Sequence, residues 1–167
     1  MLIMFLRHGD AVQSPDLQDS ERPLSDLGNQ QAAAVGKFLH DHNLVPASVI
    51  SSPLIRAAKT AGIVGNAIGI SKIETSEYLV PGTRKTQLVD HLNQLHPESV
   101  LLVGHEPHIS QSISFLLADH ENVHVDVRKA SLACLLASDP VRAGHAQLQW
   151  LVPVDFVMTR RRTRDGN

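Results

Sequence analysis

Apolar residues gather in short runs separated by polar segments, and the runs predict strands over 2–6 and 99–103. Their cores, LIMFL and VLLV, contain no polar side chain. Unbroken apolar runs of this length are typical of strands that are covered on both faces of a parallel sheet. A shorter run at 47–51 predicts a third strand. We therefore expect a parallel sheet at the centre of the fold.

Between these strands, apolar residues recur at helical spacing, as in the stripe of Ala32, Val35 and Leu39. The spacing predicts helices over 29–40, 54–68, 84–96 and 109–117. Ser25 and Ser52 are the predicted N-caps of the first two, because a serine hydroxyl accepts a hydrogen bond from the first helical turn. The remaining segments predict a short strand over 71–75 and polar loops over 10–22 and 77–83.

The last third of the chain changes character. A strand is predicted over 131–138, and residues 144–153 alternate between apolar and polar, which is typical of a strand with one buried face. The alternation places four residues on one face: Ala146, Leu148, Trp150 and Val152. With a turn at 139–140, the two strands predict an antiparallel hairpin at one edge of a mostly parallel, mixed α/β sheet.

The chain of 167 residues suits one domain, which we expect to span residues 1–158. Residues 159–167 carry four arginines against one aspartate and predict a basic, disordered tail. This tail has a net charge of +3 and the whole chain −2, which leaves −5 on the domain. An acidic domain argues against a nucleic-acid-binding protein, a role that would rest on the tail alone.

Other features of the sequence predict a cytoplasmic protein without a membrane partner. No apolar run approaches the length of about 18 residues that a membrane helix needs. Met1 leads directly into the first strand, without the flank and cleavage site of a signal peptide. The single cysteine, Cys134, excludes an internal disulfide and is typical of a reducing compartment.

Four chemically active side chains fall where predicted strands end. Arg7 and His8 follow the first strand, Arg56 lies in the helical turn after the second, and His105 follows 99–103. In open α/β sheets, ligands bind outside the carboxyl ends of the strands. The same succession of a strand end and a histidine occurs twice, and it predicts that these side chains form one site.

These residue types suit the transfer of a phosphoryl group. Two guanidinium groups can bind phosphoryl oxygens through paired N–H donors. A neutral imidazole attacks phosphorus if an acceptor holds its other ring nitrogen, and a second histidine stabilises the charge on the oxygens. Gly9 is expected to let the backbone approach the phosphate. This chemistry needs no metal or cofactor, and the spacing of His105 and His108 is not that of a zinc protease.

Four segments in this order resemble the motifs of the histidine phosphatase superfamily. They are 6–11 (LRHGDA), 22–28 (RPLSDLG), 51–61 (SSPLIRAAKTA) and 103–107 (VGHEP). The short length and the spacing are similar to those of its small bacterial branch, the SixA-type phosphohistidine phosphatases. The resemblance implies a three-layer α/β/α sandwich. It also implies that His8 is the nucleophile that becomes phosphorylated, that Arg7 and Arg56 bind phosphate, and that His105 is the second pocket histidine.

Three further residues are candidates for the pocket. Asp10 is expected to orient Arg7 or the substrate. Glu77 is the one candidate for the general acid that larger family members supply between the second arginine and the second histidine; the alternative is a solvated loop carboxylate. His108 is expected on the helix surface, with the rim of the pocket as the alternative.

The short segment around Glu77 favours a phosphohistidine substrate. An alkoxide leaving group needs protonation, whereas a histidine ring leaves with a conjugate acid of pKa about 6.5 and needs less help. A short segment also leaves the pocket open to a phosphohistidine on another protein. The sequence thus predicts a metal-independent phosphatase that acts on a phosphotransfer domain of a two-component phosphorelay.

Two alternatives stay open. A broad-specificity phosphomonoesterase for small phosphorylated metabolites would be favoured if Glu77 donates a proton. A non-catalytic phosphoprotein-binding module would be expected to lack the nucleophile, and His8 is present. A phosphoglycerate mutase is less favoured, because the chain lacks room for a larger cover over the active site.

Overall fold

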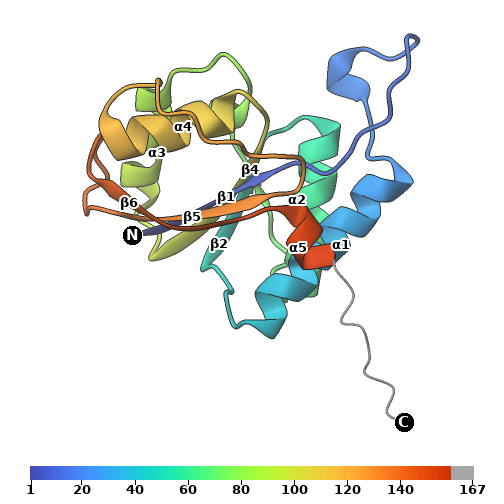
Figure 1. Cartoon of the computed structure of the whole chain (residues 1–167), viewed down its shortest axis with the longest axis horizontal. Helices are drawn as coiled ribbons and strands as arrows, with labels where there is room; N and C mark the ends of the chain where they lie inside the picture. The colour runs from blue at the N-terminus through green and yellow to red at the C-terminus, as the bar shows by residue number, and fades with distance from the viewer. Residues whose placement is uncertain (159–167) are drawn as a thin grey trace.

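The computed structural model describes residues 1–158, which form a six-stranded mixed sheet with helices on both faces (Figure 1). The order across the sheet is β3-β2-β4-β1-β5-β6. The strands are β1 (Leu2–Arg7), β2 (Ser48–Ser51), β3 (Glu74–Thr75), β4 (Ser99–Gly104), β5 (Leu132–Ala137) and β6 (Ala146–Val152). The tail predicted at 159–167 lies outside the described residues, and its disorder stays a prediction.

Residues 1–158 contain five α-helices and two short 3-10 helices. They are η1 (Asp19–Glu21), α1 (Asp26–Asp41), α2 (Ile55–Ala67), η2 (Glu77–Leu79), α3 (Lys85–Leu95), α4 (His108–Ala118) and α5 (Val154–Met158). Helices α1 to α4 match the predicted ones. Helices η1, η2 and α5 were not predicted, because such short elements show no helical period. In this part of the chain no helix is long and apolar enough to cross a membrane.

The two unbroken apolar runs form the centre of the sheet. β1 and β4 are parallel neighbours, with Phe5 opposite Leu102, and β2 and β3 continue the sheet in the same direction. Ile3 and Phe5 point into one hydrophobic core, whereas Met4 and Leu6 point into the other. Burial of each such side chain contributes roughly 1.5–3 kcal/mol, which explains why no polar residue interrupts the run.

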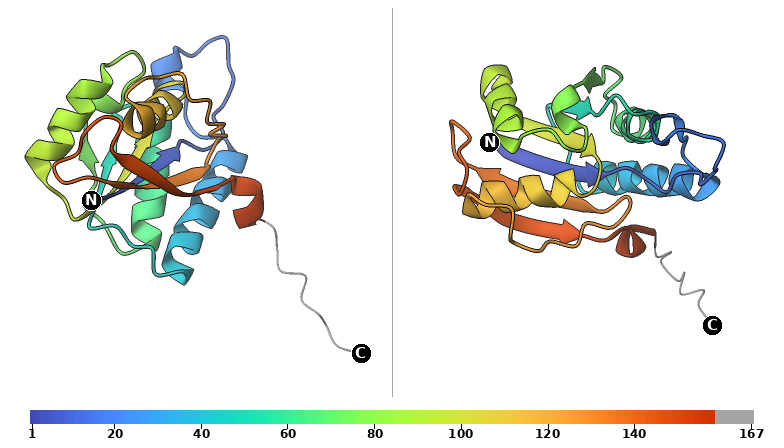
Figure 2. Two further views of the ribbon diagram at one scale, coloured as in Figure 1. Left: turned by 60° about the vertical axis from the view of Figure 1, so that its left-hand side comes forward. Right: turned by 90° about the horizontal axis from the view of Figure 1, so that it is seen from above.

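The two cores define three layers. One core lies between the sheet and helices α3 and α4, and the other lies between the sheet and helices α1, α2 and α5 (Figure 2). The predicted α/β/α sandwich with a mostly parallel mixed sheet is therefore confirmed.

The C-terminal hairpin is antiparallel, as predicted, but its alternation is not regular. β5 pairs with β1 and with β6, and a bulge shifts the register between Cys134 and Leu135. Cys134 lies opposite Trp150, whereas Leu135 lies opposite Leu148, so Gln149 is an extra residue in β6. The prediction that Leu148 and Trp150 share one face is wrong, because the extra residue turns the strand over between them.

One predicted helix cap is confirmed and the other is wrong. Ser25 is the N-cap of α1, and its hydroxyl accepts a hydrogen bond from the Gly28 amide at 3.1 Å. The N-cap of α2 is Leu54, not Ser52. The Ser52 hydroxyl accepts only a long bond of 3.3 Å from the Leu54 amide, because its stronger partner is His105, at 2.9 Å.

Candidate active site

The parallel strands bring the two predicted histidines together. His8 follows β1, His105 follows β4, and the pairing of Arg7 with Gly104 sets both strand ends level. The His8 amide donates to the Gly104 carbonyl at 3.0 Å, and the centroids of the two imidazole rings lie 5.0 Å apart. Both rings are buried. The sheet therefore places them at one site, at the carboxyl ends of its strands.

The hydrogen bonds of His8 determine which ring nitrogen carries the proton. His8 Nδ1 lies 2.7 Å from the Gly9 carbonyl oxygen, which only accepts, so Nδ1 is the protonated nitrogen. His8 Nε2 then keeps its lone pair and accepts a bond of 3.2 Å from Arg56 Nε. Burial, with smaller effects from Arg56 and Arg7, lowers the pKa of His8 to about 4. At neutral pH this ring is uncharged, with a nucleophilic lone pair on Nε2.

The second histidine has a different partner. His105 Nε2 shares a hydrogen bond with the Ser52 hydroxyl, whereas His105 Nδ1 is buried without a hydrogen-bond partner among the described residues. Burial first, then His8 and Arg56, lowers the pKa of His105 to about 3. A buried donor or acceptor without a partner costs free energy. We therefore expect an oxygen of the substrate to bind at His105 Nδ1.

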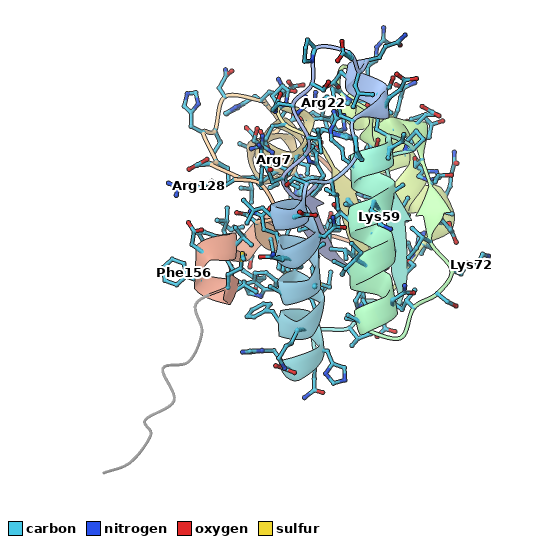
Figure 3. The ribbon with its side chains drawn as sticks, turned by 90° about the vertical axis from the view of Figure 1, so that its right-hand side faces the viewer. Arg7, Arg22, Lys59, Lys72, Arg128 and Phe156 are labelled. Carbon is cyan, nitrogen blue, oxygen red and sulfur yellow. The ribbon has the colours of Figure 1, made fainter. Side chains whose placement is uncertain are left out.

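Both predicted arginines lie at this site. Arg56 is the second residue of α2, and only 5% of it is exposed. Arg7 ends β1, and its Nη1 donates to the Val127 carbonyl at 3.0 Å, while its Nε is buried without a partner in residues 1–158. Arg7 and Arg22 both lie at the end of the molecule where α1 and α2 begin (Figure 3). The unfilled donor of Arg7 suits an oxyanion near His8.

The structure gives a reason for a glycine at position 9 that differs from the predicted one. A Cβ atom on Gly9 would lie 2.7 Å from the Gly28 carbonyl oxygen, so the side of Gly9 that would carry a side chain is filled by α1. Its amide donates to the Thr60 hydroxyl at 3.1 Å, and that hydroxyl donates to the Arg56 carbonyl at 2.7 Å. Gly9 thus allows close packing of the loop against α1 and α2.

One of the roles expected for Asp10 was to orient Arg7, which requires a contact between the two side chains. The structure shows no such contact among the described residues. The Asp10 carboxylate accepts hydrogen bonds of 2.6 Å from the Ser25 hydroxyl and 2.6 Å from Lys129 Nζ. These bonds, the one from Lys129 foremost, hold the pKa of Asp10 below its usual value. Asp10 therefore ties the loop after β1 to the start of α1 and to the segment before β5.

Glu77 has the surroundings of a solvated carboxylate, the stated alternative to a general acid, whereas His108 lies in surroundings that were not expected. Glu77 begins η2 and is exposed, and within residues 1–158 its carboxylate makes no hydrogen bond or ion pair with His8 or Arg56. His108 is buried, with 1% exposed, so its placement on the helix surface is wrong. Burial and the ammonium of Lys85 lower the pKa of His108 to about 4. Neither of its ring nitrogens has a well-formed hydrogen bond in the described structure.

Sequence reasoning missed several polar partners of the predicted site. Asp19 binds Arg56, Ser52 binds His105, Thr60 binds Gly9, and Lys129 binds Asp10. Ser52 and Thr60 lie within the motif segment 51–61, which was the available signal for them. Asp19 lies in η1 and Lys129 in the segment before β5, and the composition of these segments gives no such signal.

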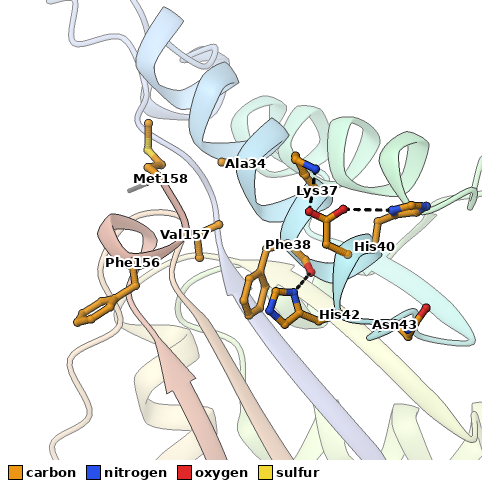
Figure 4. A pocket seen from close by; sticks show the side chains of 10 residues that line it. Ala34, Lys37, Phe38, His40, His42, Asn43, Phe156, Val157 and Met158 are labelled. Atoms are coloured by element: carbon orange, nitrogen blue, oxygen red, sulfur yellow. Dashed lines mark hydrogen bonds and ion pairs between the residues drawn. The ribbon is translucent and has the colours of Figure 1, made fainter. Parts of the chain in front are cut away.

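Within residues 1–158, neither a metal-binding cluster nor a surface hollow adds a residue to this site. No group of three or more His, Cys, Asp or Glu side chains in residues 1–158 is placed to hold a metal ion. A hollow between α1 and α5 contains His40, Asp41 and His42, and none of the predicted site residues lines it (Figure 4). There Asp41 pairs with Lys37 at 2.7 Å and with the exposed ring of His40 at 3.5 Å, as expected for surface residues.

Comparison with known proteins agrees with this arrangement. Residues 3–80 match the model of the histidine phosphatase superfamily (branch 1), a segment that contains Arg7, His8 and Arg56. An uncharacterized protein of Picosynechococcus sp. is 28% identical over 153 residues, 89% of each chain. The phosphohistidine phosphatase SixA of Escherichia coli is 28% identical over 120 residues, 70% of this chain and 74% of that protein.

The fold is likewise shared. A solved structure of the protein histidine phosphatase SixA complexed with tungstate has a TM-score of 0.84 at 22% identity, and covers 94% of this chain and 99% of that one. Paired histidines and arginines at the carboxyl ends of parallel strands have the chemistry that suits an oxyanion. The match to the histidine phosphatase superfamily over residues 3–80, a little under half of the chain, and the shared fold together support a phosphatase.

Proposed function

We propose that this protein hydrolyses phosphohistidine on a phosphotransfer domain of a two-component phosphorelay, through a phosphorylated His8. The observation that carries the proposal is the neutral His8 ring, with Nδ1–H bound to the Gly9 carbonyl and the Nε2 lone pair beside Arg56. A nucleophilic imidazole needs this tautomer and this charge.

In the first step, His8 Nε2 attacks phosphorus as Arg56 Nε moves from His8 to a phosphoryl oxygen. The bond from phosphorus to Nε2 forms and the bond to the substrate's imidazole breaks. The other nitrogen of the substrate's ring is protonated before the attack, so the imidazole leaves as a neutral ring that keeps the electron pair of the broken bond. The phosphorylated His8 ring carries a positive charge, which the Gly9 carbonyl at Nδ1 stabilises. Arg7, Arg56 and His105 bind the phosphoryl oxygens and stabilise their charge.

In the second step, a water oxygen attacks phosphorus and the bond to Nε2 breaks. The electron pair returns to His8, one proton of the water is released, and inorganic phosphate leaves. Arg7 and Arg56 supply the positive charge in both steps, so the proposed reaction uses no metal and no cofactor. These donors can bind a phosphoryl group whether a protein or a small molecule carries it.

The nature of the leaving group supports a phosphohistidine substrate. Glu77, the one candidate acid in the sequence, is exposed and makes no contact with the two histidines among the described residues. An imidazole leaving group, with a conjugate acid of pKa about 6.5, departs without a dedicated acid far more readily than an alkoxide. The partner is then a protein bearing phosphohistidine, and we expect both in the cytoplasm.

One observation favours a second function, the hydrolysis of small phosphate monoesters. Glu106 follows His105 directly, and burial raises the pKa of its carboxyl group above the usual value. A carboxyl group with a raised pKa can donate a proton to an alkoxide at a higher pH than an ordinary carboxyl group can. However, its two oxygens accept bonds from the Ser110 hydroxyl at 2.6 Å and the Ser110 amide at 3.2 Å. Glu106→Gln separates the two functions, because it would slow ester hydrolysis and spare phosphohistidine hydrolysis.

The deciding experiment measures phosphate release from a phosphohistidine-bearing phosphotransfer domain in the presence of EDTA. Wild type and His8→Ala are compared, with small phosphate esters in parallel. We expect release by the wild type, none by His8→Ala, and a higher kcat/KM for the phosphoprotein than for any ester. Faster ester hydrolysis would favour the monoesterase. Phosphate binding without hydrolysis of any substrate would identify a binding module instead.

A further inference from the structure

Arg56 divides its donors between the candidate active site and a loop. Its Nε donates to His8 Nε2 at 3.2 Å. Its other end faces Asp19 in η1: Nη1 donates to the Asp19 carbonyl, and Nη2 donates to the Asp19 carboxylate at 2.8 Å. A guanidinium group has five N–H bonds, and these three contacts leave one free on each terminal nitrogen. The contacts with Asp19 therefore leave donors that can bind phosphate.

Asp19 is itself held on its other side. Its second carboxylate oxygen accepts a bond of 3.0 Å from Arg22 Nη1, and Arg22 Nε donates to the Val12 carbonyl at 2.8 Å. The two arginines, Arg56 first, hold the pKa of Asp19 below its usual value, so the carboxylate is charged at neutral pH. Asp19 thus connects Arg56 to the loop that leaves β1.

Hydrophobic packing does not hold η1 in place. None of its residues is buried, and the side chain of Asp19 is 67% exposed. The guanidinium of Arg56 lies inside, with its outer end bound by this exposed carboxylate. A flexible arginine side chain loses considerable rotamer freedom when it is fixed in one orientation, and an ion pair of this geometry offsets that loss. The polar loop therefore contributes an anchor rather than hydrophobic packing.

We infer that Asp19 is a positioning residue, which holds the outer end of the Arg56 guanidinium so that its remaining donors face His8 and an incoming phosphoryl group. The inference rests on the proposed phosphoryl chemistry at His8. It is distinct from a competitive role, in which the carboxylate would occupy the phosphate site and leave it when phosphate binds.

The test compares Asp19→Ala and Asp19→Asn with Asp16→Ala. Asp16 is an exposed aspartate of the same loop whose carboxylate makes no contact in the described structure, so its removal matches the change in charge. Inorganic phosphate is the probe, and its dissociation constant is measured by calorimetry. We expect the two Asp19 variants to bind phosphate about 10-fold more weakly, because the arginine loses its orientation. Asp16→Ala should bind phosphate as the wild type does.

The NMR signal of the Arg56 Nε–H group reports the orientation directly, with Arg56→Lys to assign it. We expect a sharp, protected signal in the wild type and in Asp16→Ala, and a mobile, rapidly exchanging one in Asp19→Ala. Phosphate binding as tight as in the wild type, or tighter, or an unchanged Arg56 signal would overturn the inference. Neither readout needs turnover. A wild type that hydrolyses nothing would refute the proposed function, whereas the role of Asp19 would still be decided.

Discussion

The ends of β1 and β4 look alike in sequence, yet their histidines have different surroundings. Each strand is followed by a histidine that points into the same site. His8 Nδ1 donates to a carbonyl, which leaves one tautomer and a lone pair on Nε2. His105 shares its hydrogen bond with the Ser52 hydroxyl, which either donates or accepts, so His105 Nδ1 can carry a proton or a lone pair. A nucleophile needs a fixed tautomer, whereas a residue that stabilises changing charge does not.

The largest expected effect is the loss of kcat when each of the two histidines is replaced. His8→Ala should lower kcat by more than about 1,000-fold and prevent formation of a phosphoenzyme, because the attacking nitrogen is gone. His105→Ala should lower kcat by about 100-fold, as for a lost charge-stabilising donor, and still form the phosphoenzyme. Rapid quench with a radiolabelled phosphodonor measures both. A phosphoenzyme in His8→Ala, or none in His105→Ala, would reverse the two roles.

Removing the Ser52 hydroxyl, the partner of His105, should lower kcat less than removing either histidine. Ser52→Ala removes one hydrogen bond, worth about 0.5–1.5 kcal/mol, and kcat should fall by up to about 10-fold. Ser51→Ala is the matched control, because the Ser51 hydroxyl is buried at the same strand end and donates to the Ser52 carbonyl rather than to His105. Equal losses of kcat in the two variants would show that His105 does not depend on Ser52.

His8, His105 and His108 all have a lowered pKa in the folded protein, so the free energy of unfolding should depend on pH. Their folded pKa values, about 4 for His8 and His108 and about 3 for His105, lie below the usual value of 6.5. Below pH 6.5 the unfolded chain therefore binds more protons than the folded protein. The free energy of unfolding should be highest above pH 6.5 and decrease as the pH falls toward about 4.

Urea titrations between pH 7 and pH 4.5 measure this slope. His108→Gln should make the decrease shallower, because one buried ring no longer contributes. His40→Gln, which changes an exposed ring, is the control. If His108→Gln and His40→Gln gave the same slope, His108 would not be a neutral, buried group in the folded protein.

The last expected effect is on stability rather than on kcat and concerns the backbone at the two strand ends. Gly9→Ala would place a Cβ atom 2.7 Å from the Gly28 carbonyl, whereas at Gly104 the nearest atom lies 3.4 Å away. Such overpacking against the backbone should destabilise Gly9→Ala by about 1–3 kcal/mol, with Gly104→Ala close to the wild type. Thermal and urea unfolding measure the difference. A Gly9→Ala variant as stable as Gly104→Ala would mean that the contact with α1 relaxes at little cost.

Much of the site was predictable because it depends on local sequence. Apolar runs become strands, and parallel strands place their carboxyl ends together, so Arg7, His8 and His105 were expected to meet. The burial of His108 and the bulge at Gln149 were not predictable in this way. Both depend on what packs against the helix or strand from elsewhere in the chain.

The amino-acid sequence by itself determined the α/β class, the central strands and the set of residues at their ends, since periodicity and strand polarity are local properties. The tertiary structure alone decided the partners of those residues: the Gly9 carbonyl orients His8, Ser52 binds His105, and Asp19 binds Arg56. Hydrogen bonds and pKa values depend on distances of a few ångströms between segments far apart in the chain, and only folding establishes those distances.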